Sequence, residues 1–406
     1  MQKKRTRFKY LIKALFLFLL PTMLNAQPPA YQITGHLPGL EEGEKVIMSL
    51  ILDGSSKVER RDSGYVIDGA FHLTGNVPEG PRLYFMDFDR HPTKTCRLLI
   101  NNNEKITVRC DSNILRIDHG YLDDYLQIEG SPSNHTWHFF YTGITLYCQS
   151  TAQFNGILRK IRDSIGFDAQ EVGSAIMAKK ELNKALYYGL LRNPEPADVY
   201  IPAMLMELLG DKIYERSGHD AFLMAVYNAS DDAAKRTYYG KLFHQYAILS
   251  VGQPFPEFVL PDLDDKPLAL RDVVSKSKLT IVHFWAVNSY IRKETQDELR
   301  SVYKRYHDKG LNIIGVSSDT ADYEWKGFLK TQQFPWFNVS DLKGGEGVVG
   351  KIYHEYGKAS EPATTNVLID SADKIIAWDP SPTELLWYLW KYFDSGNNIV
   401  AAKDKQ

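Results

Sequence analysis

The alternation of apolar and polar residues divides the chain into a strand-rich front, a helix-rich middle and a mixed C-terminal part. In the front part, short runs rich in Val, Ile, Phe, Tyr and Thr are separated by Gly, Pro and Asn residues, the pattern of strands joined by turns. The predicted strands are 31–37, 44–52, 65–73, 82–89, 97–101 and 105–109. Their regular spacing predicts an all-β, sandwich-like domain over residues 27–130.

Two turns in this front part have specific signals. Residues Ile67–Phe71 read IDGAF, and an Asp-Gly pair between apolar residues predicts a tight hairpin. The segment between Cys96 and Cys110 reads RLLINNNEKITVR, which predicts a second hairpin centred near Asn103. There the two cysteines could face each other and form a disulfide. We favour two separate half-buried thiols over this disulfide, because a bridge between adjacent strands strains the preferred geometry.

Residues 131–250 change to a helical period. Two apolar stripes recur at this spacing: Leu182, Leu186 and Leu190, and Tyr238, Leu242, Tyr246 and Leu249. We interpret them as packing surfaces of a helical segment that joins two domains. His135 and His138 lie three residues apart but have no Cys or carboxylate cluster nearby, so we expect no metal site.

Strands alternate with helices after Val251, which predicts an α/β fold for residues 251–394 and leaves a polar tail over 395–406. Its central feature is the segment 279–294, LTIVHFWAVNSYIRKE. An apolar strand leads through Trp285 and a short polar turn into a helix that begins near Tyr290 or Ile291. This helix is predicted to run to about Lys309, with Gly310 as its C-terminal stop. Because a helix N-terminus presents unpaired N–H groups and partial positive charge, such a turn favours a reactive anion.

Charge and the N-terminus narrow the classes of function. The net charge is −2, which gives no basic field, so we expect no nucleic-acid partner. Residues 1–26 combine a basic start, an apolar run over 14–24 and a small residue, Ala26, which predicts a signal peptide. The apolar run is too short to span a membrane. We therefore expect a periplasmic or cell-envelope protein without a transmembrane segment in the mature chain; an uncleaved membrane anchor is the alternative.

Several short stretches of the C-terminal part follow one family pattern: VGQPFPEFVL at 251–260, Phe284-Trp285-Ala286 with Arg292-Lys293-Glu294, IGVS at 314–317 and LID at 368–370. This part resembles the thioredoxin-fold domains of TlpA/ResA-type envelope thiol–disulfide oxidoreductases, which are related to the peroxiredoxins (redoxin, AhpC/TSA-like). The front strands and following helices resemble the N-terminal domain of unknown function often found before such domains. The implied architecture has several domains and ends in an α/β thioredoxin fold.

The family's active turn reads Trp-Ala-Ser-Trp-Cys-x-x-Cys-Arg-Lys-Glu, whereas residues 285–294 read WAVNSYIRKE. One residue is missing and both cysteines are absent. Ser289 lies nearest the attacking cysteine but cannot replace it, because thiol exchange needs a thiolate that attacks sulfur and then leaves it. Asn288 or Ser289 also fits a helix N-cap. The resemblance implies a cis-proline loop facing the turn, and counting along the chain gives either Pro362 or Thr364 for that position.

The sequence thus favours a non-redox binding protein, with no catalytic residue, cofactor or metal. Trp285 and Tyr290 would supply aromatic contact area for an extended peptide or an envelope protein, or would pack around the helix start. The GxGxxG pattern at 345–350 does not follow the first strand of a βαβ unit, so we expect no nucleotide cofactor. One alternative is a structural scaffold; another is thiol–disulfide or peroxiredoxin-like activity in envelope redox homeostasis through Cys96, Cys110 or Cys148.

Overall fold

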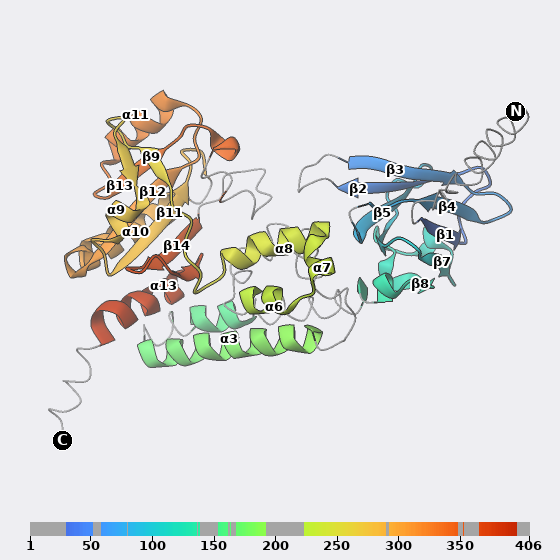
Figure 1. Ribbon diagram of the computed structural model, residues 1–406, viewed down its shortest axis with the longest axis horizontal. Coiled ribbons are helices and arrows are strands. Elements are labelled where there is room, and N and C mark those ends of the chain that lie inside the picture. Colours follow the sequence, from blue (N-terminus) through green and yellow to red (C-terminus); the bar gives the residue numbers. More distant parts are fainter. Residues whose placement is uncertain are drawn as a thin grey trace, which may run out of the picture.

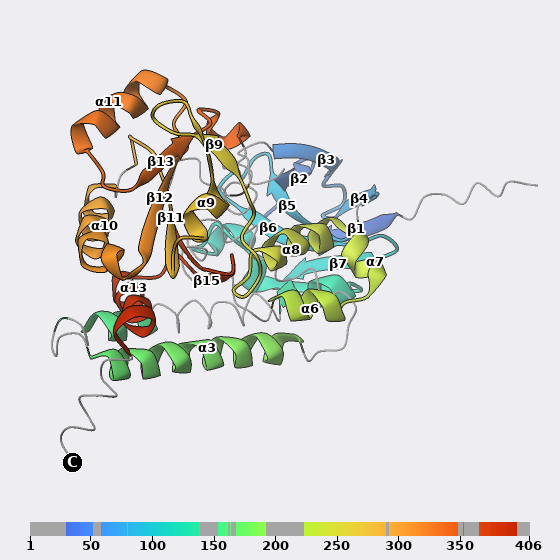
Figure 2. The ribbon, with the colours of Figure 1, turned by 60° about the vertical axis from the view of Figure 1, so that its left-hand side comes forward.

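Three parts follow one another in the computed structural model: a β-sandwich, a helical middle and a thioredoxin-like domain (Figures 1 and 2). The structure describes residues 30–51, 58–78, 80–135, 137–138, 153–160, 163, 168–191, 223–289, 292–347, 352 and 365–395. Within these ranges no helix is both long enough and apolar enough to cross a membrane. The predicted signal peptide lies outside the described residues.

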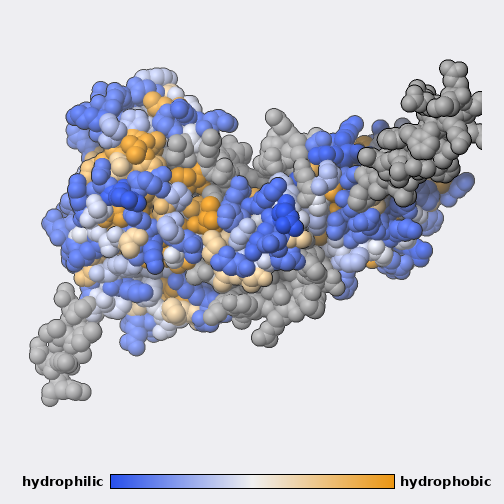
Figure 3. All heavy atoms as spheres, viewed as in Figure 1, coloured by the Kyte–Doolittle hydropathy of each residue, from blue (hydrophilic) through white to orange (hydrophobic). Residues whose placement is uncertain are grey.

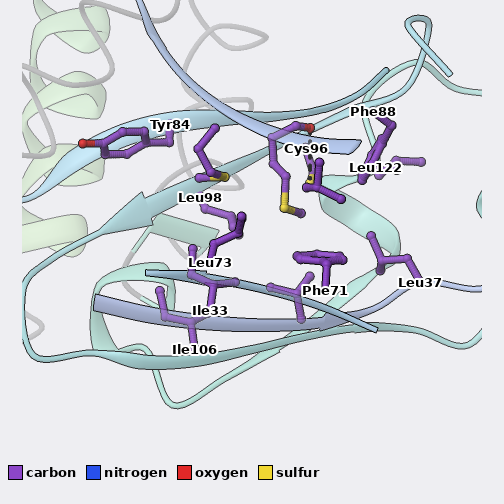
Figure 4. Packing of buried hydrophobic residues seen from close by; sticks show 14 of the residues in the cluster. Ile33, Leu37, Phe71, Leu73, Tyr84, Phe88, Cys96, Leu98, Ile106 and Leu122 are labelled. Carbon is purple, nitrogen blue, oxygen red and sulfur yellow. Dashed lines mark hydrogen bonds between the residues drawn. The ribbon is translucent and has the colours of Figure 1, made fainter. Parts of the chain in front are cut away.

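Two four-stranded sheets form the sandwich, with strand orders β4-β1-β7-β8 and β3-β2-β5-β6. The strands are β1 Tyr31–His36, β2 Lys45–Ile51, β3 Val58–Tyr65, β4 Phe71–Gly75, β5 Arg82–Phe88, β6 Thr95–Ile100, β7 Lys105–Cys110 and β8 Leu126–Glu129. Short 3₁₀ helices span Ile114–Arg116 and Asp123–Tyr125. The inner faces of both sheets supply one core, in which Ile33 and Ile106 lie across from Leu98 (Figure 4).

The predicted sandwich is confirmed, but two of its strands, β3 and β8, were missed. β3 reads VERRDSGY and lies at a sheet edge, so it lacks the apolar alternation of a half-buried strand. The run predicted as one strand over 65–73 is interrupted by the Asp68-Gly69 turn. Both turn residues have positive φ, 52° and 72°, as a type I′ turn requires. The tight turn is therefore confirmed, but β3 and β4 on its two sides belong to different sheets, so it does not join two paired strands as the predicted hairpin would.

The hairpin predicted around Asn103 is wrong. β6 and β7 belong to opposite sheets, so the chain crosses the edge of the sandwich instead of folding back on itself. Asn103 has a φ of 66°, its N–H donates to the carbonyl of Ala30 (3.1 Å), and β7 then pairs in parallel with β1. Cys96 and Cys110 are free, buried thiols, so the disulfide considered for them is absent and they are separate.

The C-terminal domain has a five-stranded mixed sheet of order β13-β12-β11-β14-β15. β11 Leu279–Trp285, β12 Leu311–Ser317 and β13 Phe337–Ser340 are parallel, and β14 Thr365–Asp370 and β15 Ile375–Trp378 are antiparallel additions. A separate hairpin pairs β9 Val259–Pro261 with β10 Pro267–Ala269. This is the predicted α/β thioredoxin fold.

Helices cover both faces of this sheet. α9 Leu270–Val274 and the segment before it cover one face, and α10 Arg292–Tyr306 and α13 Pro382–Leu389 cover the other. α11 spans Asp322–Gln332, 3₁₀ helices span His307–Lys309 and Gly344–Glu346, and a π-helical stretch spans Trp390–Asp394. Gly310 ends the α10 region with a φ of 109°, a left-handed conformation that favours glycine. It confirms the predicted stop.

The helical middle contains α3 Ala169–Leu191, α6 Leu223–Ala229, α7 Asp232–Arg236 and α8 Tyr238–Ile248. Both predicted helices exist. Leu249 of the second predicted stripe is 1% exposed and Leu242 packs, partly buried, against the same core, while α8 also buries Tyr239, Phe243 and Ala247. Tyr238 instead lies under the guanidinium of Arg82 from β5, whose carbon is 3.5 Å from the ring centroid. Leu182, the first residue of the other predicted stripe, is 40% exposed on α3 and so is not a core residue. The side chains of Leu186 and Leu190 lie outside the described part of the chain.

The helical middle contacts both neighbouring domains. The Leu83 N–H of β5 donates to the Tyr239 hydroxyl of α8 (3.1 Å). On the other side, the ammonium of Lys179 in α3 forms a buried ion pair with Glu384 of α13 (3.3 Å). α3 lies beside α13 in both ribbon views (Figures 1 and 2). The middle is therefore packed between two domains and is not a free linker.

Candidate functional site

The strand, turn and helix predicted at 279–294 are present in the structure. The Ser289 N–H donates to the Ala286 carbonyl (3.1 Å), which closes a β-turn directly after β11. At the apex of the turn Asn288 is exposed, while Val287 and Ser289 are half-buried. α10 begins at Arg292. Tyr290, Pro362 and Thr364 lie outside the described residues, so their places beside the turn remain predictions.

Trp285 lies inside the domain and offers no contact area to a partner. Its side chain is 1% exposed and packs in a cluster with Trp325 and Leu329. Its ring centroid lies 5.5 Å from that of Phe328 and 6.1 Å from that of Phe334. Of the two roles considered for Trp285, packing is therefore the one that the geometry fits. The tryptophan supports the turn from below.

Asp319 fixes the start of the turn and was missed at the sequence level. Its carboxylate accepts the Val287 N–H through both oxygens (3.0 and 3.1 Å) and the Ser317 hydroxyl (2.6 Å). Sequence inspection found no carboxylate within the turn, because Asp319 follows a different strand. A signal did exist: β11 and β12 are parallel, so residues just after both strands meet at one edge of the sheet.

The described cysteine thiols are far from this chemistry. Cys96 of β6 and Cys110 of β7 belong to the sandwich core, and their side chains are 0% and 6% exposed. Burial, with Asp123 and Asp87 nearby, raises the pKa of the Cys96 thiol well above its usual value. A thiol that stays protonated and inaccessible is a poor nucleophile. Cys148 lies outside the described residues.

A buried histidine lies directly below the turn on the central strand. His283 is 1% exposed, and its Nδ1 lies 2.9 Å from Oδ1 of Asn366 on β14. Burial lowers its pKa to about 4, although the Asn366 hydrogen bond acts in the opposite direction. Sequence analysis assigned it no role; the signal was a single imidazole inside the apolar strand LTIVHFW.

The described residues contain no group of three or more His, Cys, Asp or Glu side chains that could hold a metal ion. His135 and His138 belong to no such group. The chemistry of the turn region thus consists of one carboxylate that fixes the backbone, one buried neutral imidazole and an exposed amide.

Comparison with known proteins assigns the family. Residues 251–378 match the AhpC/TSA family, and residues 31–137 match a domain of unknown function, DUF4369. The thiol-disulfide oxidoreductase ResA of Bacillus cereus is 31% identical over 140 residues, which make up 34% of this chain and 75% of that protein. The chain belongs to the TlpA/ResA-type thioredoxin-fold family.

Two further proteins are similar to this ResA-type chain. The peroxiredoxin bcp1 of Schizosaccharomyces pombe is 28% identical over 96 residues, which are 24% of this chain and 49% of that protein. The structure of a thiol-disulfide oxidoreductase from Bacteroides fragilis aligns with 25% identity and a TM-score of 0.30, covering 34% of this chain and 98% of that one. The AhpC/TSA and ResA matches confirm the family resemblance drawn from the sequence, and the DUF4369 match confirms the front domain as the predicted domain of unknown function.

Proposed function

We propose that this ResA-type chain is an exported, non-redox binding protein whose turn at 286–291 contacts an extended segment of a partner. One observation carries the proposal. The turn keeps its strand, backbone hydrogen bond and helix, but it contains no cysteine, and the two described thiols are buried in another domain. Thiol–disulfide exchange needs an accessible thiolate, so the geometry favours contact over redox chemistry.

The surface of the thioredoxin-like domain supports this proposal. On the face seen in Figure 3, apolar side chains gather on the thioredoxin-like end of the molecule, whereas the sandwich end is mostly hydrophilic. The described part of that domain exposes Tyr323, Val259 and Phe337 at 75%, 58% and 44%. Apolar side chains that gather on one face are typical of interaction surfaces, whereas single exposed ones are ordinary. The contacting residues of the turn itself would be Asn288 and Ser289, supported from below by Trp285.

Insulin reduction tests the absence of redox activity. With dithiothreitol as the donor, the purified protein should precipitate insulin no faster than a no-protein control. A redox-active homologue with an intact C-x-x-C turn serves as the positive control. Turnover above background would overturn the proposal. If turnover were found, loss of it in a variant with Cys96, Cys110 and Cys148 all changed to Ser would assign it to the front and middle of the chain.

Site-specific crosslinking tests the contact. A photoreactive amino acid at the exposed Asn288 should yield a crosslinked partner in cells. The matched control is Lys276, which is also exposed but precedes β11 and so lies at the opposite end of the central strand. Capture from both positions, or from neither, would contradict a specific contact at the turn.

A structural scaffold is the second candidate, and the packing of the helical middle favours it. The Leu83–Tyr239 hydrogen bond and the Lys179–Glu384 ion pair join that middle to both neighbouring domains. The substitution Asn288→Arg separates the two functions. It should abolish partner capture by a binding turn, with unchanged thermal stability, whereas a scaffold should retain every partner. Glu384→Gln, which weakens the ion pair between α3 and α13, should lower the thermal stability and leave partner capture by a binding turn unchanged.

The envelope location belongs to this proposal as well. It rests on the predicted signal peptide, and N-terminal sequencing of the protein from the envelope fraction should start at Gln27. A chain that begins at residue 1 would leave the uncleaved anchor as the better explanation.

A further inference from the structure

A row of polar residues crosses the buried side of the thioredoxin-like sheet below the turn. His283 of β11 pairs in register with Asn366 of β14 on one side and with Gly315 of β12 on the other. Gly315 pairs in turn with Asn338 of β13. Paired residues project to the same face of a sheet, and Ile281, Ile313, Trp336 and Leu368, each two residues away along its strand, belong to the core under α10. The row therefore lies between the sheet and α10.

Gly315 lets two polar side chains approach the sheet closely in this row. A Cβ at Gly315 would lie 2.4 Å from Oδ1 of Asn338 and 3.1 Å from Nε1 of Trp285. Both atoms thus project over the glycine, where any side chain would collide with them. Neither has a hydrogen-bond partner among the described residues, although both side chains are more than nine-tenths buried.

Two further buried atoms in the same layer have no hydrogen-bond partner among the described residues. One is Nε2 of His283, and the other is Nε2 of Gln296, whose side chain is 4% exposed. Gln296 is the fifth residue of α10, so it lies roughly 6 Å along the helix from its start. His283 lies two residues before the end of β11, roughly 7 Å along the strand. Because α10 runs in the opposite direction to β11 after the turn, Gln296 and His283 lie at about the same distance from the turn.

The hydrogen-bonding roles of the four atoms are complementary. Asn366 Oδ1 can only accept, so Nδ1 of His283 carries the proton and its Nε2 presents a lone pair. The amide nitrogen of Asn338 donates to the Trp336 carbonyl (2.9 Å), which leaves its Oδ1 as a second acceptor. Trp285 Nε1 and Gln296 Nε2 are donors. The layer between the sheet and the start of α10 thus contains two donors and two acceptors, none of which has a partner among the described residues.

We propose that His283, Gln296, Asn338 and Trp285 form an internal binding site for ordered water beneath the turn. Water is the ligand that both donates and accepts hydrogen bonds, as two donors and two acceptors together require. Buried water typically makes about three hydrogen bonds to polar groups that are otherwise unpaired. Bound water here would join the central strand, β13 and the first turns of α10, and so fix the base of the turn without any sulfur chemistry.

The direct test uses the unmodified protein. In NMR spectra, the indole N–H of Trp285 should show a cross-peak to a long-lived water molecule, and long-range ¹⁵N correlations should place the His283 proton on Nδ1. A crystal structure at a resolution that shows ordered water should hold one within hydrogen-bond distance of at least three of the four atoms. A dry site in the crystal, with no water contact at Trp285, would overturn the proposal.

Substitutions give an independent test through stability. Thr280 of β11 also has a buried hydroxyl without a partner, but on the opposite face of the strand, so Thr280→Val is the matched control. Replacing an isolated unpaired group by an apolar one is neutral or stabilising, and this is expected for Thr280→Val. Gln296→Met should instead lower the folding equilibrium constant about fivefold or more, because it removes a partner of bound water.

A double variant completes this test. Gln296→Met combined with Asn338→Leu should cost less than the product of the two single effects, because both residues act on the same water. A neutral Gln296→Met, or effects that multiply independently, would show four unrelated unpaired groups and contradict the proposal. Gly315→Ala, whose methyl group would push Asn338 Oδ1 and Trp285 Nε1 away from their positions, should abolish the Trp285 water cross-peak. A persisting cross-peak in that variant would also contradict it.

Discussion

Thiol chemistry needs both a cysteine and access to it; the sandwich core has only the cysteines, and the thioredoxin turn has only the access. The sandwich holds thiols without access, since Cys96 and Cys110 are buried among apolar side chains. The turn has access without thiols, since Asn288 is exposed and no cysteine lies between residues 279 and 294. The comparison shows that fold and reactivity are separable here. Trp285 packing and the Asp319–Val287 hydrogen bonds hold the turn, and neither requires sulfur.

Moving a thiol from one region to the other should produce the largest difference. In a Cys148→Ser background, Cys96 and Cys110 should react with a thiol reagent at least roughly 10³-fold more slowly in the native protein than in urea, because labelling requires unfolding. Ser289→Cys in the same background should add one rapidly labelled site before α10. Mass spectrometry after timed quenching measures both rates. Fast native labelling at Cys96 would show that the sandwich opens, and a silent Ser289→Cys would show that the turn is closed.

Truncating the support of the turn should have the next largest effect. Trp285→Ala removes a fully buried aromatic ring and should lower the free energy of unfolding by about 3–5 kcal/mol. Asn288→Ala removes an exposed amide from the same turn and should change it by less than about 0.5 kcal/mol. Urea unfolding at pH 7 measures both. Equal effects would mean that Trp285 contributes little to packing, contrary to its 1% exposure.

The protonation of His283 should affect stability on a similar scale. The folded-state pKa is lowered to about 4 by burial, with the Asn366 hydrogen bond opposing, while an unfolded histidine titrates near 6.5. Between these values the unfolded chain binds a proton that the folded chain does not, so stability falls as the pH drops from 6.5 to 4. The full difference is on the order of 3 kcal/mol.

Comparing variants isolates that contribution from the other titrating groups. Urea unfolding of the wild type and of His283→Gln between pH 7 and pH 4 should show a steeper loss of stability in the wild type. His244 is exposed on α8, and His244→Gln should leave the wild-type slope unchanged. If His283→Gln and the wild type have the same slope, the imidazole is hydrated enough to titrate normally and the burial argument fails.

Sequence patterns predicted what depends on neighbours along the chain. The thioredoxin elements, the Asp68-Gly69 turn and the Gly310 stop follow from apolar periodicity and positive-φ residues. The failures concern neighbours across space. The Asn103 segment has the composition of a hairpin, yet β7 pairs with β1, because burying both sheet faces outweighs local turn preference. β3 carries charged residues because it lies at a sheet edge and none of its described side chains is buried in the core.

The site could be predicted only as far as one strand and its turn. Trp285 was identified as a residue of the turn, but its burial depends on Phe328 and Phe334, more than forty residues later in the sequence. Asp319 and Asn366 reach the site from β12 and β14 through strand order alone. A list of residues near the turn in sequence could not contain either of them.

Removing the anchor of the turn should give the smallest of these effects and the most specific one. Asp319→Ala leaves the Val287 N–H and the Ser317 hydroxyl without their partner and should cost about 1–3 kcal/mol. Asp370→Ala is the matched control, because that carboxylate also accepts two backbone N–H groups, from Ala372 and Lys374 (2.9 and 3.0 Å), in the turn between β14 and β15. Both should destabilise the protein by similar amounts. Only Asp319→Ala should change the labelling rate of Ser289→Cys, because only that residue fixes where the turn begins. If Asp370→Ala changes the labelling rate equally, the labelling reports global stability, and Asp319 has no special role in holding the exposed turn in place.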